Sequence, residues 1–325
     1  MNAPKSPIVF SPIYKDYIWG GTRIATAYGR PGTPKVCAES WEISAHPDGQ
    51  SVVASGPFKG QTLGELASAF GAALTGSRAP VSTCFPLLFK LIDARDRLSV
   101  QVHPNNANAA LTHGEPKTEM WFVLDRTPKA QLFAGLAQGV TQDSLRAALA
   151  AGTAEAQLVR LPIEPEQALF IPGGLVHAIG AGCLIYEVQQ NSNTTYRLFD
   201  WNRTGVDGKP RQLHIEESFK SIDWSLTPPQ MREPVPCGKS GQNTWFDVVS
   251  CDYFTLRKLD LKEAVTIPVD GSSFQALFVV KGRVTVSAGG ETVALETGAS
   301  CLIPAAATDY TLSTDTASTV LVTTL

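Results

Sequence analysis

Several features that mark other classes of protein are missing from this chain of 325 residues. No apolar run approaches the roughly 18 residues of a membrane span, and the N-terminal stretch MNAPKSPIVFSPIYKDYIWGG has no apolar core like that of a secretory signal. The formal net charge is −3, so the chain lacks the basic excess that non-specific nucleic-acid binding requires. These absences predict a cytoplasmic protein that binds neither a membrane nor nucleic acid.

Closely spaced cysteines are missing as well. The chain has six cysteines but no C-x-x-C pair, which disfavours both a disulfide scaffold and a thiolate zinc site. We expect all six to be small buried residues: Cys37, Cys84, Cys183, Cys237, Cys251 and Cys301. With 43% hydrophobic residues the chain can bury a sizeable core, and its length predicts two domains or one composite body.

Short runs rich in β-branched and aromatic residues, separated by Gly, Pro and Asn, dominate the sequence and predict a mainly β fold. The expected strands lie within 50–55, 85–92, 98–104, 120–125, 168–173, 183–189, 254–261, 276–288, 291–295 and 318–325. Helical periodicity is confined to three segments, near 62–74, 143–152 and 214–222.

Two pairs of segments resemble each other and indicate an internal duplication. EMWFVL at 119–124 is similar to QALFVV at 275–280, and LFIPGGLVH at 169–177 is similar to CLIPAAATD at 301–309. The Pro-rich segment around 225–243 separates the copies, so we expect one unit over 1–235 and a second over 236–325. The second copy has no histidine, so a metal site belongs to the first.

Four polar residues of the first copy form a candidate metal site. Gln101 and His103 alternate along one extended segment, so both side chains point to the same side. Together with Glu119 and His177 they offer two imidazoles, a carboxylate and an amide oxygen, a set that suits a divalent ion such as zinc. Each residue alone is a weak signal, and the prediction depends on the set.

The same residues resemble the signatures of the cupin superfamily. Pro172, Gly174 and His177 match its second signature, P-x-G-x-x-H, and Q-x-H at 101–103 followed by Glu119 is similar to a variant of its first. The usual first signature starts H-x-H and has its Glu a few residues later, whereas here the Glu follows His103 by sixteen residues.

These departures point to type I phosphomannose isomerases in their short bacterial form. The segments that resemble this family are YIWGGTRI (17–24), AESWEISAHPDG (38–49), LSVQVHP (98–104), KTEMW (117–121), IPGGLVHAIGAG (171–182) and YEVQQNSNTTYRLFDW (186–201). The resemblance implies two cupin-type, jelly-roll-like β-barrels with a small helical insertion around 139–158. It also implies a zinc-assisted interconversion of mannose-6-phosphate and fructose-6-phosphate, with Gln101, His103, Glu119 and His177 as ligands of one ion.

The resemblance also assigns candidate catalytic residues. Lys117 falls on an active-site lysine of the family, and it would share the inward face with Glu119 if the strand began that early; the alternative is a surface lysine. Glu187 and Arg197 match a Glu and an Arg at the same separation. A guanidinium suits a phosphate or an enediolate, whereas Glu187 either carries a proton or orients a neighbour.

Weaker candidates complete the predicted site. Ser99 alternates with Gln101 and resembles a family serine associated with the sugar phosphate. Trp19 matches a motif near the family's site, but aromatic residues in β proteins are more often core than contact residues. At 193 the chain has Asn where the family usually has Asp, and we expect Asn193 to be positional. His113 lies in a loop near the expected cleft, whereas we assign His46 and His214 to structure.

Two other functions remain open at this point, an iron-dependent cupin oxygenase and a non-catalytic sugar-binding or regulatory cupin; an isomerase of another sugar phosphate is a further alternative. Oxygenases use an open site of two His and one carboxylate, so a fourth ligand at Gln101 disfavours them. The sequence does not decide between a monomer and a homodimer, nor between a catalytic and a structural role for zinc.

Overall fold

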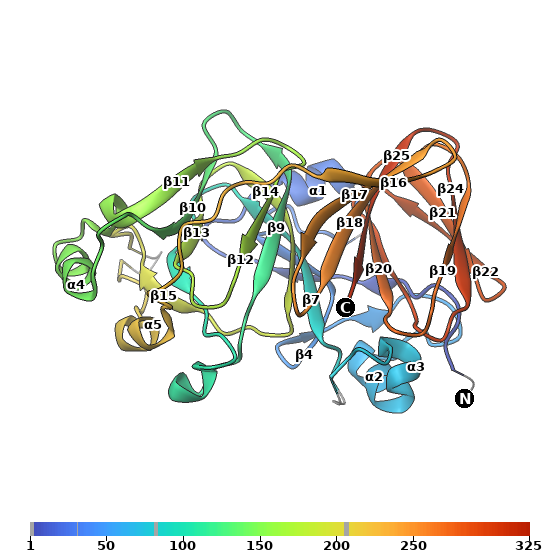
Figure 1. The fold of residues 1–325 in the computed structure, drawn as a ribbon, viewed down its shortest axis with the longest axis horizontal. Coiled ribbons are helices and arrows are strands. Elements are labelled where there is room, and N and C mark those ends of the chain that lie inside the picture. Colours follow the sequence, from blue (N-terminus) through green and yellow to red (C-terminus); the bar gives the residue numbers. More distant parts are fainter. Residues whose placement is uncertain (1–2, 31, 81–83, 205–207) are drawn as a thin grey trace.

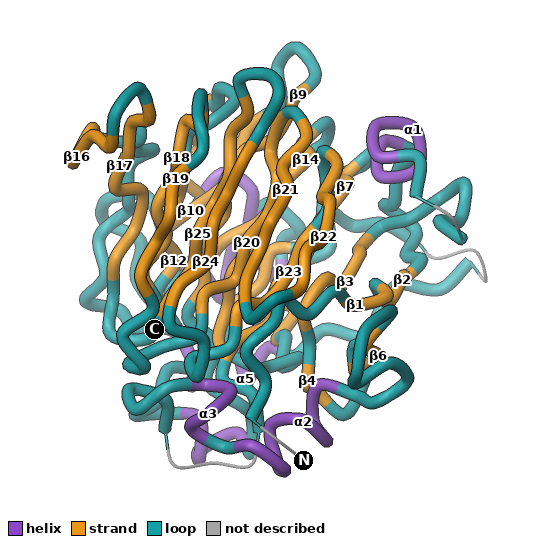
Figure 2. Tube along the Cα trace, turned by 90° about the vertical axis from the view of Figure 1, so that its right-hand side faces the viewer, coloured by secondary structure: helices purple, strands orange, loops and turns teal. Residues whose placement is uncertain are grey.

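The computed structural model describes residues 3–30, 32–80, 84–204 and 208–325. Its strands form four principal antiparallel sheets that follow one another along the longest axis of the molecule (Figure 1). Figure 2 shows α2 and α3 together at one edge of the sheets and α1 at another, so helices flank the strands. The predicted mainly β, cupin-type fold is confirmed.

The first unit pairs a six-stranded sheet with a five-stranded one. The six-stranded sheet has the order β12 (Ala168–Ile171), β9 (Glu119–Arg126), β14 (Cys183–Gln190), β7 (Leu87–Ala94), β3 (Glu39–Ile43), β2 (Ile13–Lys15). The five-stranded sheet has the order β11 (Leu158–Pro162), β10 (Gln131–Leu136), β13 (His177–Ile179), β8 (Val100–Val102), β15 (Tyr196–Phe199). Two small ladders join β1 (Phe10–Ser11) to β6 (Val52–Val53) and β4 (Ala45–His46) to β5 (Gly49–Gln50).

The second unit repeats this arrangement. Its six-stranded sheet has the order β23 (Ser300–Ile303), β20 (Gln275–Lys281), β25 (Ser318–Thr324), β18 (Thr255–Leu261), β17 (Asn243–Ser250), β16 (Val235–Ser240). Its four-stranded sheet has the order β22 (Glu291–Glu296), β21 (Arg283–Ala288), β24 (Asp309–Ser313), β19 (Val265–Pro268). Both units are therefore two-sheet antiparallel structures of the jelly-roll type.

Strand register supports the duplication inferred from the sequence. Glu119 lies opposite Ile171 in the first unit, and the residues aligned with them, Gln275 and Ile303, lie opposite each other in the second. The strand β16 falls inside the Pro-rich segment at 225–243, so the second unit's sheet starts before that segment ends. Residue Ile8 also pairs with Leu302, which ties the N-terminal segment to the second unit. The domain boundary near 235 stays a prediction.

The two six-stranded sheets pack back to back and share one apolar core. The ring of Tyr186 stacks on that of Phe278 with centroids 4.3 Å apart, and Phe85 packs on Phe274 at 4.5 Å. Because side chains alternate along a strand, the residue after Tyr186 faces the other way, into the first unit. The strand β14 therefore carries the contact between units on one face and the site on the other.

Helices lie close to the three predicted segments. They are α2 (Leu63–Phe70) with α3 (Ala72–Thr75), α4 (Gln142–Ala150) in the predicted insertion, and α5 (Ile215–Ser221). The element η2 (Ala154–Gln157) also falls within the predicted insertion, whereas α1 (Arg23–Tyr28) and η1 (Ala109–Thr112) were not expected. No helix in the described part of the chain is long and apolar enough to cross a membrane.

The expected burial of the cysteines holds only in part. Cys37, Cys183 and Cys301 are buried, whereas Cys84 and Cys251 are half-buried. Cys237 is exposed, because the outer strand β16 presents its side chains to solvent. The prediction was wrong for this residue.

Candidate metal centre and active site

A cavity of about 270 Å³ opens between the six-stranded and five-stranded sheets of the first unit. All nine predicted site residues line it: Trp19, Ser99, Gln101, His103, Lys117, Glu119, His177, Glu187 and Arg197. Further lining residues include Tyr17, Glu39, Lys90, Asn193 and Arg211. The fold thus brings together segments that are far apart in the sequence.

The five-stranded sheet presents three of these residues in one row. His177 on β13 lies opposite Gln101 on β8, and Gln101 lies opposite Arg197 on β15. Residues opposite each other in an antiparallel ladder point to the same face. Gln101 therefore stands between the candidate ligand His177 and the guanidinium of Arg197.

The six-stranded sheet carries a second row of residues that faces the first row across the cavity. Trp121 on β9 lies opposite Glu187 on β14, and Glu187 lies opposite Lys90 on β7. The Trp121 Nε1–H donates to Glu187 Oε1 at 2.9 Å, and Lys90 Nζ lies 3.2 Å from Glu187 Oε2. Two residues along β9, Glu119 faces the same cavity.

Three buried side chains converge at one point of the cavity. The Nε2 atoms of His103 and His177 lie 3.2 Å apart, and the carboxylate of Glu119 lies 3.7 Å from His103 Nε2 and 3.4 Å from His177 Nε2. Ligand atoms about 2.0–2.1 Å from a tetrahedral ion lie about 3.4 Å from one another. These separations fit a single small divalent ion. Among the described residues, this is the group of His, Cys, Asp and Glu side chains compact enough to hold a metal.

The two imidazoles are prepared for such a role. His177 Nδ1–H donates to the Leu175 carbonyl at 2.8 Å, which leaves Nε2 as the free lone-pair donor. Burial lowers the pKa of His177 to about 4. Burial, together with the charge of Lys117, also holds the pKa of His103 well below its usual value. Both rings are neutral at pH 7, and the neutral imidazole is the form that binds metals.

Lys117 and Glu119 form a buried ion pair at the metal cluster. Lys117 Nζ lies 3.0 Å from Glu119 Oε2, and both side chains are almost fully buried. The strand β9 begins at Glu119, so Lys117 precedes it rather than belonging to it; its backbone N–H is instead bonded to the Pro104 carbonyl at 2.9 Å. Burial raises the pKa of Glu119, although Lys117 opposes the shift. The surface-lysine alternative is wrong, because Lys117 is 5% exposed.

Lys90 is a buried cation of the site that the sequence analysis did not single out. Its ammonium, 4% exposed, lies between Glu187 at 3.2 Å and Glu39 at 3.8 Å. Burial would lower the pKa of Lys90, but the two carboxylates outweigh burial and raise it. Burial likewise opposes ionisation of Glu187, yet Lys90 and Lys117 lower its pKa, so Glu187 is a carboxylate at neutral pH. A lysine inside the apolar run FPLLFKLI was the signal available in the sequence.

Arg197 and Arg211 supply positive charge elsewhere in the cavity. Arg197 Nη1 donates to the Gln212 carbonyl at 2.7 Å, while its buried Nε has no hydrogen-bond partner in the described part of the chain. Arg211 is bound to Asp200. Arg211 lies in a loop segment after β15 and was not among the predicted site residues.

Three of the weaker candidates, Trp19, Ser99 and Asn193, line the cavity. Trp19 lines the cavity and stacks on Tyr17 with centroids 5.3 Å apart, while Ser99 is buried in the wall. Asn193 also lines it, and its Nδ2–H donates to Asp48 Oδ2 at 2.6 Å, which fits the positional role expected for it.

Three other histidines do not line this cavity. His113 is exposed at the end of η1, and His46 contacts the Glu115 carboxylate at 3.2 Å. The His214 ring accepts a hydrogen bond from the Arg197 backbone N–H, in keeping with a structural assignment.

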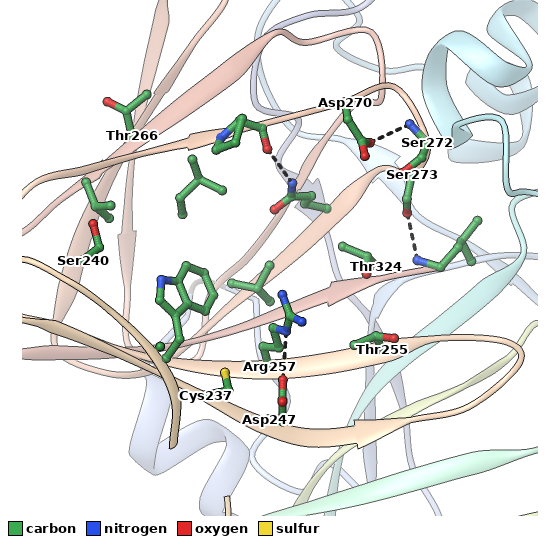
Figure 3. Close-up of a pocket in the computed structure, with 18 of the residues that line it drawn as sticks. Cys237, Ser240, Asp247, Thr255, Arg257, Thr266, Asp270, Ser272, Ser273 and Thr324 are labelled. Carbon is green, nitrogen blue, oxygen red and sulfur yellow. Dashed lines mark hydrogen bonds and ion pairs between the residues drawn. The ribbon is translucent and has the colours of Figure 1, made fainter. Parts of the chain in front are cut away.

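The second unit has a larger cavity of about 770 Å³ at the corresponding place (Figure 3). There Arg257 lies opposite Val322, as Lys90 lies opposite Glu187, and Gln275 takes the place of Glu119. Arg257 pairs with Asp247 at 3.0 Å. The lining residues include no histidine, so the metal-type cluster described above belongs to the first unit.

Comparison with known proteins matches both units to one family. A model of the catalytic domain of type I phosphomannose isomerases matches residues 8–129, and a model of the mannose-6-phosphate isomerase cupin domain matches residues 244–323. The two matches fall on either side of the Pro-rich segment.

Individual relatives extend over most of the chain. The mannose-6-phosphate isomerase of Streptococcus mutans is 35% identical over 288 residues, which are 88% of this chain and 89% of that protein. ManA of Bacillus subtilis is 35% identical over 304 residues, 92% of this chain and 93% of that protein. The crystal structure of the Bacillus subtilis mannose 6-phosphate isomerase is 31% identical, covers 98% of this chain and 99% of its own, and superimposes with a TM-score of 0.87. The chain therefore belongs to the type I phosphomannose isomerase family.

Proposed function

We propose that this isomerase interconverts mannose-6-phosphate and fructose-6-phosphate with the help of one zinc ion in the first unit. The observation that carries the proposal is the convergence of His103, Glu119 and His177 in a cavity that also holds Lys117 and Glu187. The names of the relatives in Streptococcus mutans and Bacillus subtilis support the substrate pair. A cytoplasmic location and a monomeric or homodimeric state remain predictions.

His103, Glu119 and His177 would hold the ion, and Gln101, opposite His177, would provide an amide oxygen as fourth ligand. When bound, zinc supplies a Lewis acid that polarises the sugar oxygens beside it. The neutral state of both imidazoles and the buried carboxylate fit this donor set. A role of the ion in orienting substrate is compatible with the same geometry.

Aldose–ketose isomerisation moves a proton between two adjacent carbons through an enediol and needs a base and a stabiliser of oxygen charge. Glu187 is ionised and fixed by Trp121 and Lys90, and it is our candidate for the base; the alternative role is to orient a neighbouring group. The ammonium of Lys117 donates toward developing negative charge on oxygen. The guanidinium of Arg197 binds the anionic part of the substrate.

A coupled assay with mannose-6-phosphate tests the proposal, run before chelation, after chelation, and after zinc is added back. We expect turnover that disappears on chelation and returns with zinc, and slower turnover of glucose-6-phosphate, which differs at C2. Absence of turnover with zinc-loaded protein would overturn the substrate assignment, and turnover unaffected by complete removal of metal would overturn the role of zinc.

A further inference from the structure

Arg211 shares the cavity with Arg197 and is held by a carboxylate behind it. Its Nε donates to Asp200 Oδ2 at 2.8 Å and its Nη2 to Asp200 Oδ1 at 2.6 Å. Asp200, which directly follows β15, is 5% exposed. This bidentate ion pair with Asp200 uses Nε and Nη2 of Arg211, so the Nη1 hydrogens of Arg211 are not engaged in it.

Positive charge exceeds negative charge in this corner of the site. Asp200 also accepts from Arg203 Nη2 at 2.6 Å, and Arg203 has Asp96 at 3.2 Å as a second partner, so two carboxylates face the three guanidiniums of Arg197, Arg203 and Arg211. Arg197 bonds to a backbone carbonyl, and its Nε is buried with no hydrogen-bond partner among the residues that the structure describes. Burial and the neighbouring charge of Arg211 both lower the pKa of Arg197. Buried cationic N–H groups without partners are costly unless an anion binds them.

The cations near the metal cluster are in a different state. Lys117 is paired with Glu119, and Lys90 is paired with Glu187 and Glu39. Among the side chains, the cations there are matched by carboxylates, and the charge of the divalent ion proposed above would be taken up by the sugar oxygens. At the arginine end, side-chain cations outnumber the carboxylates paired with them.

We propose that Arg211 and Arg197 together form the phosphate subsite of the cavity, with Asp200 as the positioning residue that fixes Arg211. The inference rests on the proposed sugar-phosphate substrate and adds a second phosphate-binding guanidinium. Across β13, β8 and β15 the backbone positions of His177 and Arg197 are two strand spacings apart, about 10 Å. A six-carbon sugar phosphate fits this span, with its carbonyl end at the metal cluster and its phosphate at the arginines.

Arg203 provides a matched control. Both arginines pair with Asp200, but only Arg211 lines the cavity. In Arg211→Ala, Asp200 keeps Arg203 as a partner, and in Arg203→Ala it keeps Arg211, so neither variant leaves this carboxylate buried and unpaired. Arg211→Lys keeps the charge and removes the fork.

The experiment measures binding of inorganic phosphate to the full chain by calorimetry, together with KM and kcat for mannose-6-phosphate and the thermal midpoint. Loss of one charge-assisted phosphate contact is expected to weaken phosphate binding about 10-fold or more in Arg211→Ala, and to raise KM by a similar factor with kcat within about 3-fold. Arg211→Lys should fall between Arg211→Ala and the wild type. Arg203→Ala should stay within about 2-fold of the wild type.

Three outcomes would overturn the subsite: undetectable phosphate binding by the wild type, unchanged binding in Arg211→Ala, or an equal loss in Arg203→Ala. The last would assign the effect to Asp200 or to net charge. A wild type that binds phosphate in an Arg211-dependent manner but does not turn over mannose-6-phosphate would support the subsite while refuting the proposed reaction. The two proposals therefore fail in distinguishable ways.

Discussion

The Nε2 atoms of His103 and His177 lie 3.2 Å apart although the residues are 74 positions apart in the chain. One follows β8 and the other begins β13, and these strands are neighbours in the five-stranded sheet. Two neutral imidazoles at this distance, with the Glu119 carboxylate beside them, form a site that suits a proton or a metal ion.

Substitution of His177 tests the metal centre directly. We expect the wild type to contain about one zinc per chain, because the described residues contain one cluster of suitable ligands, and His177→Ala to lose the metal and the activity together. Elemental analysis of the purified proteins measures the content. His113→Asn is the control, since His113 is exposed, lies outside the cavity and has a positive φ of 53° that Asn tolerates. Full zinc content in His177→Ala would refute the assignment.

Replacement of Lys117 separates catalysis from metal binding. Lys117→Ala removes the ammonium 3.0 Å from Glu119 but none of the candidate ligands. We expect kcat to fall about 100-fold or more, the usual loss for a proton-transfer or charge-stabilising group, while zinc content stays unchanged. Steady-state kinetics with parallel elemental analysis decides the matter. Unchanged turnover would remove Lys117 from the mechanism.

The buried pair of Lys90 and Glu187 is expected to control stability as well as activity. Lys90→Met leaves the Glu187 carboxylate buried beside only Lys117, which should cost about 3–5 kcal/mol in the free energy of unfolding. The double variant Lys90→Met/Glu187→Gln should regain part of that loss, since the fully buried Glu187 charge is removed and only the more exposed Glu39 carboxylate is left without Lys90. Urea unfolding measures both. A double variant less stable than Lys90→Met would contradict this explanation.

The pair of Lys90 and Glu187 should stabilise the folded state only within a range of pH. The folded-state pKa of Glu187 is lowered, so its contribution to stability is present above the unfolded pKa of about 4.3 and is lost as pH falls below it. The folded-state pKa of Lys90 is raised, so its contribution is present below about 10.4 and is lost as pH rises through the folded value. The difference in unfolding free energy between wild type and double variant should therefore decrease below about pH 4.3 and above about pH 10.4, while Glu119, whose pKa depends on both residues, adds a change near pH 7. A difference that decreases at neither extreme would contradict the pairing.

The contact between the two units predicts that a large-to-small substitution within it destabilises the protein. Phe278 is fully buried and stacks on Tyr186, so Phe278→Ala should lower the free energy of unfolding by about 3–5 kcal/mol. Leu111→Ala is the control, because Leu111 is 64% exposed and should change stability by less than about 0.5 kcal/mol. Equal effects of the two substitutions would mean that the units do not depend on this contact.

Much of the site was predictable because its residues follow local rules. Gln101 and His103 alternate along a short strand and its end, and the P-x-G-x-x-H turn places His177 at the start of another. Lys90 was missed because a strand pattern does not reveal which carboxylates will face a buried lysine; Glu187 and Glu39 come from β14 and β3, on either side of β7. Arg211 gave no local signal, since only the packing of its loop segment against β15 brings it to the cavity.

Some of the strands that were not predicted are ones in which tertiary context outweighs local pattern. The strands β13 and β15 have three and four residues, too few for an alternation to be recognised. The strand β16 contains Pro236 and is fully exposed, and it is tolerated because it is the outer strand of its sheet. A Pro-rich polar segment of this kind is typical of a linker, so its pairing with β17 depends on the partner strand.

The shared core between the six-stranded sheets has a consequence for synthesis of the protein. The back face of β14, which carries Tyr186, is covered by β20 and β25, whose residues are made more than 80 positions later. Until residues 318–324 have left the ribosome, the ligand-bearing half of the molecule has an uncovered apolar face. We expect the metal-binding half to acquire its native rigidity only after translation of the second copy, which makes that copy an intramolecular folding partner for the first.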